Sequence, residues 1–423
     1  MKKIVALLLI ALLLSVSGCL RGGDETHTET PGSGEVKETN APKEVNATEA
    51  ALEIARGENI FAVGLYGRVA EGDGNVLISP YSIHTALTMA YEGAEGKTAR
   101  EMETVLHLPA EREVRLVGFK ELIENLNPKD ETYKLRTANA LWVQKDYPIR
   151  DSYIETIRSY YLSEVRKIDF QRNPEEAAST INDWVREKTG GKIKGIVSPE
   201  AVRDSKLVIT NAIYFSAEWV HKFDPHLTDN ETFFTPRGPV IAPMMHTEGV
   251  FNYTENDLVQ VLELPYTGGR LSMVILLPKE RNGYKRLEGE MTEEYLLSLL
   301  ANLSPANVSV TIPKFEFMGE YELSSVLSAM GMKSAFGNGA NFSGITPAKG
   351  LYISEVVHKA YIKVAENGTE AAAVTGVLMA STSLHFEEPT YVEFHADHPF
   401  IFIILDRKTG EILFLGRLTN PKG

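Results

Sequence analysis

The sequence has almost no cysteine. Cys19 is the only one among 423 residues, so no disulfide can form within the chain. Basic clusters are also missing: 43 Lys and Arg stand against 57 Asp and Glu, and no run of basic residues carries interleaved aromatic side chains. Such runs are typical of nucleic-acid-binding surfaces. With a net charge of −14, the chain is therefore not expected to bind nucleic acid.

The common signatures of enzyme active sites are missing too. The sequence contains no G-x-S-x-G nucleophile elbow and no H-E-x-x-H zinc helix. The letters GKT at 96–98 match the end of a phosphate-binding loop, but Tyr91 stands where its first glycine should be. Histidines are scattered along the chain. We therefore expect no catalytic residue, no metal, no cofactor and no enzymatic activity.

The N-terminus is the one long hydrophobic run. MKK precedes IVALLLIALLLSV, and SGC follows, ending at Cys19. A charged start, a short apolar run and a small-residue exit are typical of a secretory signal rather than a membrane span. VSGC also resembles a lipoprotein box, so we expect a signal peptide at 1–18 and lipid on Cys19. The alternative is an ordinary signal peptide with an incidental cysteine. Either predicts a secreted protein, and the lipid predicts attachment to the membrane surface outside the cell.

Residues 19–50 are expected to form a flexible tether. They are rich in Thr, Glu, Gly and Pro and lack large apolar groups, so they cannot bury enough surface to order themselves. With 43% hydrophobic and 24% charged residues, the rest of the chain suits a large globular body. No repeat or second linker interrupts it. We expect one domain over 51–423.

Helical and strand patterns are segregated along this domain. Apolar residues recur at helical spacing in 50–70, 79–94 and 175–193, and Gly190-Gly191 is expected to end the last of these helices. Later segments alternate or run apolar, as strands do: 206–215, 258–266, 271–278, 307–317, 400–406 and 411–418. The letters DRKTGE predict a hairpin turn between the last two. Helices followed by long, mostly antiparallel strands indicate an α+β fold.

One segment is unusual for its position. ENGTEAAAVTGVLMAST, at 366–382, lies between two strongly apolar strand patterns but contains mainly small, uncharged residues. Small side chains lose little entropy on burial and fit an existing gap. The segment is therefore compatible with an exposed loop and with a buried central strand, and Gly368 supplies backbone freedom at its start. The alternative is an ordinary surface helix or loop.

The letters HKAYIKVAENGTEAAAVTG closely resemble the hinge of the serpins, a family of serine protease inhibitors. Other segments match the same family in order and at similar distances along the chain: SPYSIHTALTMAYEGAEGKTAREM, ANALWVQ, INDWVREKTGGKIKGIV, TNAIYFSAEWVHKF, LPYTGGRLSMVILLP, IPKFEF, FSGI and ADHPFIFII. Each motif alone is weak, but the ordered set is specific. The resemblance covers the domain from about residue 51, and the N-terminal tether is outside it.

The resemblance implies a metastable fold with three β-sheets, eight or nine helices and an exposed reactive-centre loop. In this family a serine protease cleaves the loop and becomes esterified to it. The loop then inserts into the largest sheet as an extra strand, and the covalent complex persists. About fourteen residues of strand span roughly 45 Å, which is enough to carry the protease across a domain. The chain is thus expected to be a monomeric, irreversible inhibitor, or alternatively a non-inhibitory serpin that acts as a binding or chaperone module.

The resemblance also assigns residues to the loop. The hinge comprises Glu366, Gly368, Thr369, Ala371, Ala372 and Ala373. The family spacing places the scissile bond between Thr382 and Ser383, although Ser381 and Leu384 remain alternatives because the following segment is slightly long. A small residue at the cut predicts an elastase-, chymotrypsin- or subtilisin-like target rather than a trypsin-like one.

A second group of residues matches the zone where the largest sheet of a serpin opens: Ser79, Ser82, Asn211, Trp219 and His358. His358 lies in an apolar strand pattern, so by itself it is more simply a buried, hydrogen-bonded histidine than a catalyst. The family agrees, because the matching histidine lies behind the large sheet near the residue that corresponds to Asn211.

Overall fold

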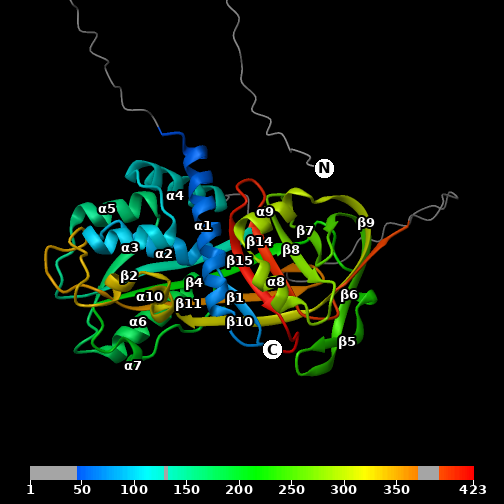
Figure 1. The fold of residues 1–423 in the computed structure, drawn as a ribbon. Coiled ribbons are helices and arrows are strands. Elements are labelled where there is room, and N and C mark those ends of the chain that lie inside the picture. The colour runs from blue at the N-terminus through cyan, green and yellow to red at the C-terminus, as the bar shows by residue number, and fades with distance from the viewer. Residues whose placement is uncertain (1–44, 128–131, 370–389) are drawn as a thin grey trace, which may run out of the picture. The chain divides into compact units, whose positions relative to one another are not determined.

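A computed structural model describes residues 45–127, 132–369 and 390–423. The α-helices in these residues are α1 (Ala47–Val69), α2 (Pro80–Tyr91), α3 (Gly96–Leu106), α4 (Arg112–Leu126), α5 (Asp151–Tyr160), α6 (Pro174–Lys188), α7 (Pro199–Val202), α8 (Tyr284–Glu290), α9 (Glu293–Ala301) and α10 (Ser324–Met330) (Figure 1). Short 3-10 helices lie at η1 (Pro225–Leu227) and η2 (Lys333–Phe336). The resemblance implied eight or nine helices, and the described residues contain ten α-helices, of which α7 has only four residues.

The strands in the same residues are β1 (Val76–Ile78), β2 (Tyr133–Gln144), β3 (Glu164–Ile168), β4 (Leu207–Glu218), β5 (Asp229–Thr235), β6 (Gly238–Glu255), β7 (Val259–Pro265), β8 (Leu271–Pro278), β9 (Ser304–Pro313), β10 (Phe315–Glu322), β11 (Ile353–Ala365), β12 (Gly368–Thr369), β13 (Val392–His395), β14 (Phe400–Asp406) and β15 (Ile412–Leu418). The apolar patterns of the sequence reappear as β4, β7, β8, β14 and β15. The pattern at 307–317 is divided at Lys314 into β9 and β10.

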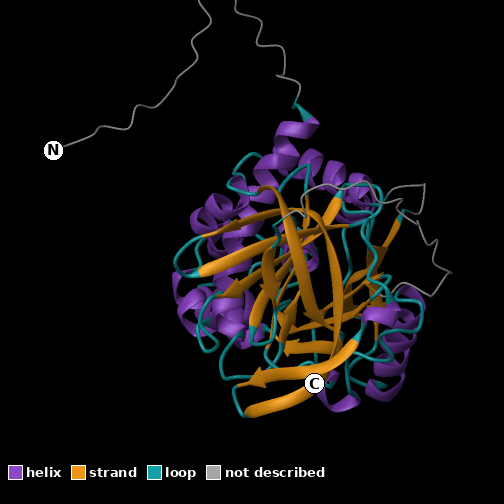
Figure 2. Ribbon diagram, turned by 90° about the vertical axis from the view of Figure 1, so that its right-hand side faces the viewer, coloured by secondary structure: helices purple, strands orange, loops and turns teal. Residues whose placement is uncertain are grey.

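The strands form the α+β architecture expected from the sequence. One six-stranded sheet has the order β10-β11-β12-β4-β2-β3. The other strands form a nine-stranded network in which β6 serves two sheets: residues 238–253 pair with β5 and β9, and residues 252–255 pair with β7. These two parts and the six-stranded sheet are the three expected sheets. Figure 2 shows the strands in the interior and the helices around them.

Local sequence explains where the helices begin and end. The side chain of Asn46 accepts hydrogen bonds from the backbone N–H of Thr48 and Glu49, so α1 begins at Ala47, ahead of the expected domain start at Ala51. α6 ends before Gly190 and Gly191, as the sequence predicted. Both glycines have positive φ, of 62° and 80°, which other residues resist.

Alternation along β2 divides the core. Ala140 and Trp142 face the α6 side, where the Trp142 and Trp184 rings meet edge to face with centroids 5.4 Å apart. Leu141 and Val143 face the other way and join the cluster formed with α1 and α2. Successive residues of a strand point to opposite faces, so along 140–143 of β2 helices pack on both faces of the six-stranded sheet.

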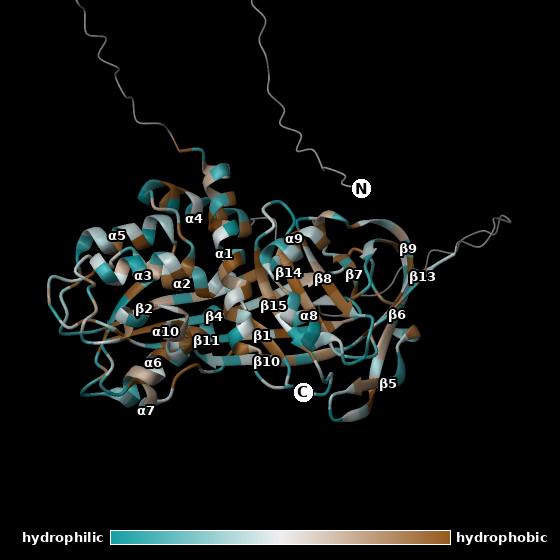
Figure 3. Cartoon of the chain, in the orientation of Figure 1, coloured by the Kyte–Doolittle hydropathy of each residue, from teal (hydrophilic) through white to brown (hydrophobic). Residues whose placement is uncertain are grey.

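The strands β8, β14 and β15 form the centre of the other sheet. Every residue of these three strands is buried, and Figure 3 shows hydrophobic residues concentrated along them. Burying a large aliphatic or aromatic side chain contributes about 1.5–3 kcal/mol. No helix in the described residues is long and apolar enough to cross a membrane.

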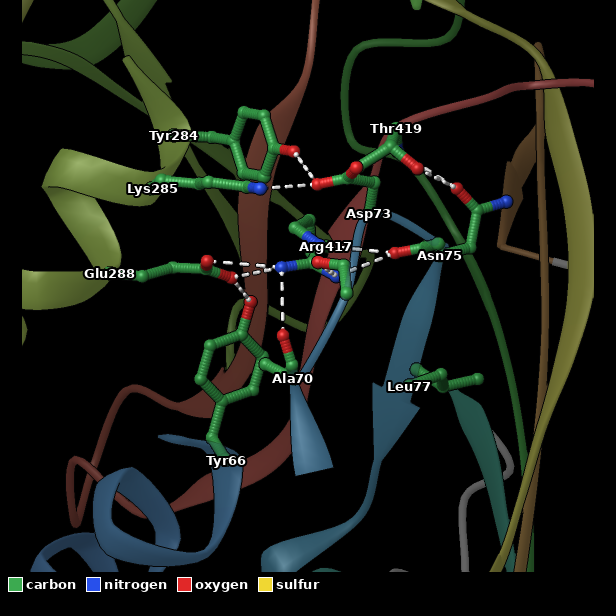
Figure 4. A network of polar contacts seen from close by, with 12 residues as sticks. Tyr66, Ala70, Asp73, Asn75, Leu77, Tyr284, Lys285, Glu288, Arg417 and Thr419 are labelled. Carbon is green, nitrogen blue, oxygen red and sulfur yellow. Dashed lines mark hydrogen bonds and ion pairs between the residues drawn. The ribbon is translucent and has the colours of Figure 1, made fainter. Parts of the chain in front are cut away.

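Arg417 in β15 ties the end of α1 to α8. Its Nη1 donates to both carboxylate oxygens of Glu288, at 2.8 and 3.0 Å, and the side chain is fully buried (Figure 4). The same guanidinium donates to the carbonyl oxygens of Ala70, Gly72 and Gly74. A buried charge is costly unless it is paired and hydrogen-bonded. This network therefore fixes the chain between α1 and β1 against β15.

Candidate functional site

The six-stranded sheet contains a seam between β4 and β11. The two strands pair in parallel, from Ile353 opposite Leu207 to Tyr361 opposite Tyr214. Beyond Tyr361 and Tyr214 the two strands separate, and β12 lies between them. Thr369 is opposite Val364 on β11 and Ala217 on β4, and β12 runs antiparallel to both neighbours. The seam therefore holds the two-residue strand β12, whose direction fits both neighbours.

Gly368 is required by the close approach at this point. Its φ is +153°, and a Cβ atom built on it would lie 2.1 Å from the carbonyl oxygen of Ala217. Thr369 follows, with its side chain fully buried and its hydroxyl 2.7 Å from the Tyr266 hydroxyl. Burial raises the pKa of Tyr266, so both hydroxyls stay neutral and share one hydrogen bond.

Glu366 is held at the entrance to β12. Nζ of Lys314 lies 2.9 Å from its carboxylate, and the Thr228 hydroxyl donates to the same group at 3.0 Å. Burial raises the pKa of Glu366, but the hydrogen bonds from Lys314 and Thr228 outweigh burial and hold that pKa below its usual value. The carbonyl oxygen of Glu366 accepts from the backbone N–H of Phe223 at 3.0 Å. The hinge is thus anchored on both its side chain and its backbone.

Trp219 closes the same end of the seam. Its ring stacks on Tyr266 with centroids 4.5 Å apart and 12° between the planes. Its indole N–H donates to the carbonyl oxygen of Ala365 at 2.9 Å, and its backbone N–H donates to that of Asn367 at 2.9 Å. The resemblance assigns Trp219 to the opening zone together with Ser79, Ser82, Asn211 and His358, and it lies beside the hinge residues, where an inserted strand would begin.

The other four residues of that group come together lower in the sheet, where a buried polar network crosses the seam. Nδ1 of His358 on β11 is hydrogen-bonded to Oδ1 of Asn211 on β4, directly opposite. Asn211 Nδ2 donates to the Ser82 hydroxyl at 2.5 Å. Ser79 caps α2, and its own hydroxyl donates to the carbonyl oxygen of Leu413 at 2.6 Å. The network links α2 to both strands that flank the seam.

His358 is neutral in this network. Its Nε2 accepts from the backbone N–H of Ser79 at 3.1 Å, so the ring proton must lie on Nδ1, which donates to Asn211. Burial lowers the pKa of His358 to about 3. A ring with both nitrogens engaged in this way has no free lone pair for general-base catalysis. His358 therefore acts as a connector between strands.

Asn139 completes the network and was missed by the sequence analysis. It lies on β2 directly opposite Asn211, and its Oδ1 accepts from Asn211 Nδ2 at 2.6 Å and from the Ser82 hydroxyl at 2.9 Å. A signal was present, because Asn139 is the one polar residue in the stretch ANALWV at 138–143. A buried polar residue in such a position needs a partner.

Several residues assigned from the sequence lie outside the described residues. These are Cys19, Ala371, Ala372, Ala373, Thr382 and Ser383. In the part of the chain that the structure describes, no group of three or more His, Cys, Asp or Glu side chains is arranged to hold a metal ion.

Comparison with known proteins gives a consistent result. Residues 56–421 match the family described as serpin (serine protease inhibitor). An uncharacterized serpin-like protein of Thermococcus kodakarensis is 46% identical over 98% of both chains, and the leukocyte elastase inhibitor of Bos taurus is 39% identical over 85% of this chain and 97% of its own. The structure of human thyroxine-binding globulin superposes with a TM-score of 0.80 at 30% identity, covering 88% of this chain and all of that one.

Proposed function

Because the chain belongs to the serpin family, we propose that it is an irreversible suicide-substrate inhibitor of serine proteases and not an enzyme. The observation that carries the proposal is the position of β12. Gly368 and Thr369 lie between β4 and β11, and the strands below them pair in parallel. A loop that continued from Thr369 along the seam would run antiparallel to both strands.

The proposed reaction begins with cleavage of the loop. The protease serine attacks the carbonyl carbon of Thr382, the bond to the nitrogen of Ser383 breaks, and an ester joins the two proteins. The freed loop then enters the seam behind Thr369. β4 and β11 have 12 and 13 residues, so most of an inserted strand would gain a neighbour on each side. Each ladder hydrogen bond contributes about 0.5–1.5 kcal/mol net.

Insertion requires the seam to open at the polar network. The hydrogen bond between His358 and Asn211 joins the two strands that must separate. The other members of the network lie outside these strands: Asn139 on β2, Ser82 on α2 and Ser79 immediately before α2. Breaking one buried hydrogen bond without replacing it costs about 1–3 kcal/mol. We propose that this cost keeps the seam closed until the loop is cut, and that Ser79, Ser82, Asn211, Trp219 and His358 act as the opening zone.

We propose an elastase-, chymotrypsin- or subtilisin-like target. The support is the small residue Thr382 at the expected cut, together with the name of the bovine relative, a leukocyte elastase inhibitor. We also propose that the chain is a monomer outside the cell, anchored by lipid on Cys19. Mass spectrometry of membrane-bound protein should find a lipid-modified Cys19 as the first residue, and Cys19→Ser should release the protein.

A second candidate function is ligand binding by a serpin that does not insert its loop. The support for this second function is the similarity to the structure of thyroxine-binding globulin in complex with its ligand. The buried Thr369 argues for the inhibitor, because a loop that has already entered the sheet needs no further change of direction to continue.

The deciding experiment is incubation of the domain with elastase, chymotrypsin, subtilisin and trypsin. An inhibitor should form an equimolar complex with at least one of them that survives denaturing electrophoresis. The same protease with its catalytic serine replaced by alanine should form none. Cleavage of the loop by every protease without any such complex would reject the proposed function.

A further inference from the structure

Two glutamates are buried together where α1 packs beside the start of β15. Glu58 lies on α1 and Glu411 immediately precedes β15, and both side chains are fully buried. Figure 1 shows α1 beside β15. All four carboxylate oxygens lack a hydrogen-bond donor among the described residues. Nothing in the proposed inhibition mechanism uses this pair.

The backbone around Glu411 is held in place from α1. Nδ2 of Asn59 donates to the carbonyl oxygen of Gly410 at 2.9 Å, and its Oδ1 accepts from the backbone N–H of Ile412 at 3.0 Å. Asn59 thus clamps the residues on both sides of Glu411. Because Glu58 precedes Asn59 in α1, the clamp holds the backbones that carry the two glutamates against each other.

Other charged groups near the pair are already engaged. Asp406 is fully buried and receives two hydrogen bonds from Arg270, at 3.1 and 2.8 Å. Tyr81 of α2 is the other titratable neighbour: burial, then the charges of Glu411 and Glu58, raise its pKa. Asp406 adds negative charge, and the Arg270 guanidinium is directed to Asp406. No cation of the described residues is hydrogen-bonded to the pair.

Two adjacent carboxylates without donors cannot both stay ionised in a buried site. Burial raises the pKa of Glu411 to about 7. Burial first, and then the charge of Glu411, raises the pKa of Glu58 well above its usual value. A proton placed between the two groups satisfies one oxygen of each and removes the repulsion.

We propose that Glu58 and Glu411 hold one proton between them at neutral pH, as a carboxyl group that donates to a carboxylate, and that this shared proton latches α1 to the turn before β15. The latch weakens as pH rises. In the unfolded chain both groups release their protons near pH 4.3, whereas the folded protein keeps one until neutral or alkaline pH. Folding stability from the pair is therefore complete in acid and is lost as pH rises through the folded pKa. The inference is independent of protease inhibition.

The test is guanidinium unfolding of the intact protein between pH 6 and 9. In that range, the equilibrium constant for unfolding should rise by about tenfold per pH unit for each proton that only the folded state holds. Glu58→Gln and Glu411→Gln should each flatten this dependence. The glutamine amide donates to the remaining carboxylate at every pH, so the folded protein no longer has to hold a titratable proton there. Glu53→Gln on the exposed side of α1 is the control and should retain the wild-type slope.

Glu355 must be separated from this effect, since burial also raises its pKa to about 7. The Glu355→Gln protein therefore serves as a second background, in which the infrared band of protonated carboxyl groups is followed. We expect a band at pH 6 that disappears toward pH 9, even if the Glu58 and Glu411 variants fail to fold. No such band, or pH slopes in both variants equal to wild type, would overturn the latch. Stabilisation at pH 9 by Na⁺ but not by tetramethylammonium, lost in both variants, would show a metal cation in place of the proton and would also overturn it.

Discussion

His358 and Asn211 face each other across the only parallel junction in the middle of the six-stranded sheet, as far as the described residues extend, and they are joined side chain to side chain. The bond fixes the histidine as a neutral donor. It also places a titratable group at the point where the proposed insertion would separate the sheet. Under that proposal, acidity and sheet opening would be coupled through one residue.

The first prediction follows from this coupling. An unfolded histidine binds a proton near pH 6.5, whereas folded His358 resists protonation until about pH 3. The folded pKa is depressed, so the stability that it contributes is present above pH 6.5 and is lost as pH falls toward 3. The slope from this group should be about 1.4 kcal/mol per pH unit. Guanidinium unfolding between pH 6.5 and 4.5 should show it, and His358→Gln should remove it; an unchanged slope in the variant would contradict the assignment.

The second prediction concerns nicking of the loop. Cleavage near Thr382 by any protease should let the loop enter the seam and form two rows of hydrogen bonds. Each single hydrogen bond contributes about 0.5–1.5 kcal/mol net. Burial of Val377 and Met379 would add about 1.5–3 kcal/mol per side chain. Since the whole stability of a domain is about 5–15 kcal/mol, the nicked protein should unfold at much higher guanidinium than the intact one. A cut in an ordinary surface loop would leave the midpoint equal or lower.

The third prediction is that Thr369→Arg converts the inhibitor into a substrate. The Thr369 side chain is fully buried and contacts Tyr266, so an arginine there would have to bury a charge for β12 to stay in the seam and for the loop to follow it. The yield of denaturant-resistant complex should fall at least tenfold, while cleavage of the loop continues. Thr369→Val keeps the shape and removes only the hydroxyl, so it should retain most of the complex. Equal yields from the arginine variant and wild type would argue against insertion.

The fourth prediction tests the position of β12. In Gly368→Ala, the new methyl group would meet the carbonyl oxygen of Ala217, and the positive φ would be strained, at a cost of at least about 1 kcal/mol. We expect β12 to leave the seam, which exposes Trp219 and shifts its fluorescence to longer wavelength. Gly337→Ala is the matched control, since its Cβ would meet nothing within 4 Å. The same red shift in both variants would show that the effect is not specific to the seam.

Much of the fold could be predicted because its determinants are local. The strand β8 coincides with its apolar pattern, and α6 ends before Gly190 and Gly191 as expected. The helical pattern was placed at 50–70 and the start of the domain at Ala51, whereas α1 begins at Ala47, because the cap on Asn46 lies among polar residues that otherwise suggest a tether. Turn residues and periodicity act over a few positions, so they can be read directly from the chain.

The features that escaped prediction depend on contacts between distant segments. The depth to which β12 enters the seam is set by Ala217 and Tyr266, which lie far from Gly368 in the sequence. Glu58 and Glu411 resemble ordinary surface acids, because neither periodicity nor spacing reveals that both are buried against each other. Asn139 was visible as an isolated polar residue, but its partners on β4 and α2 were not.

The directions of the strands around the seam also have a consequence for selectivity. From β10 to β2 the chain runs alternately down and up, except that β11 and β4 point the same way. Because β11 and β4 run in the same direction, a strand that runs in the opposite direction fits between them and restores the alternation. A strand that entered the seam would therefore have to run antiparallel to both neighbours, whatever its side chains. A free peptide with the sequence of residues 369–382 should compete with the loop only when its backbone runs antiparallel to both β4 and β11, because in the opposite direction its N–H and C=O groups would be out of step with both neighbours.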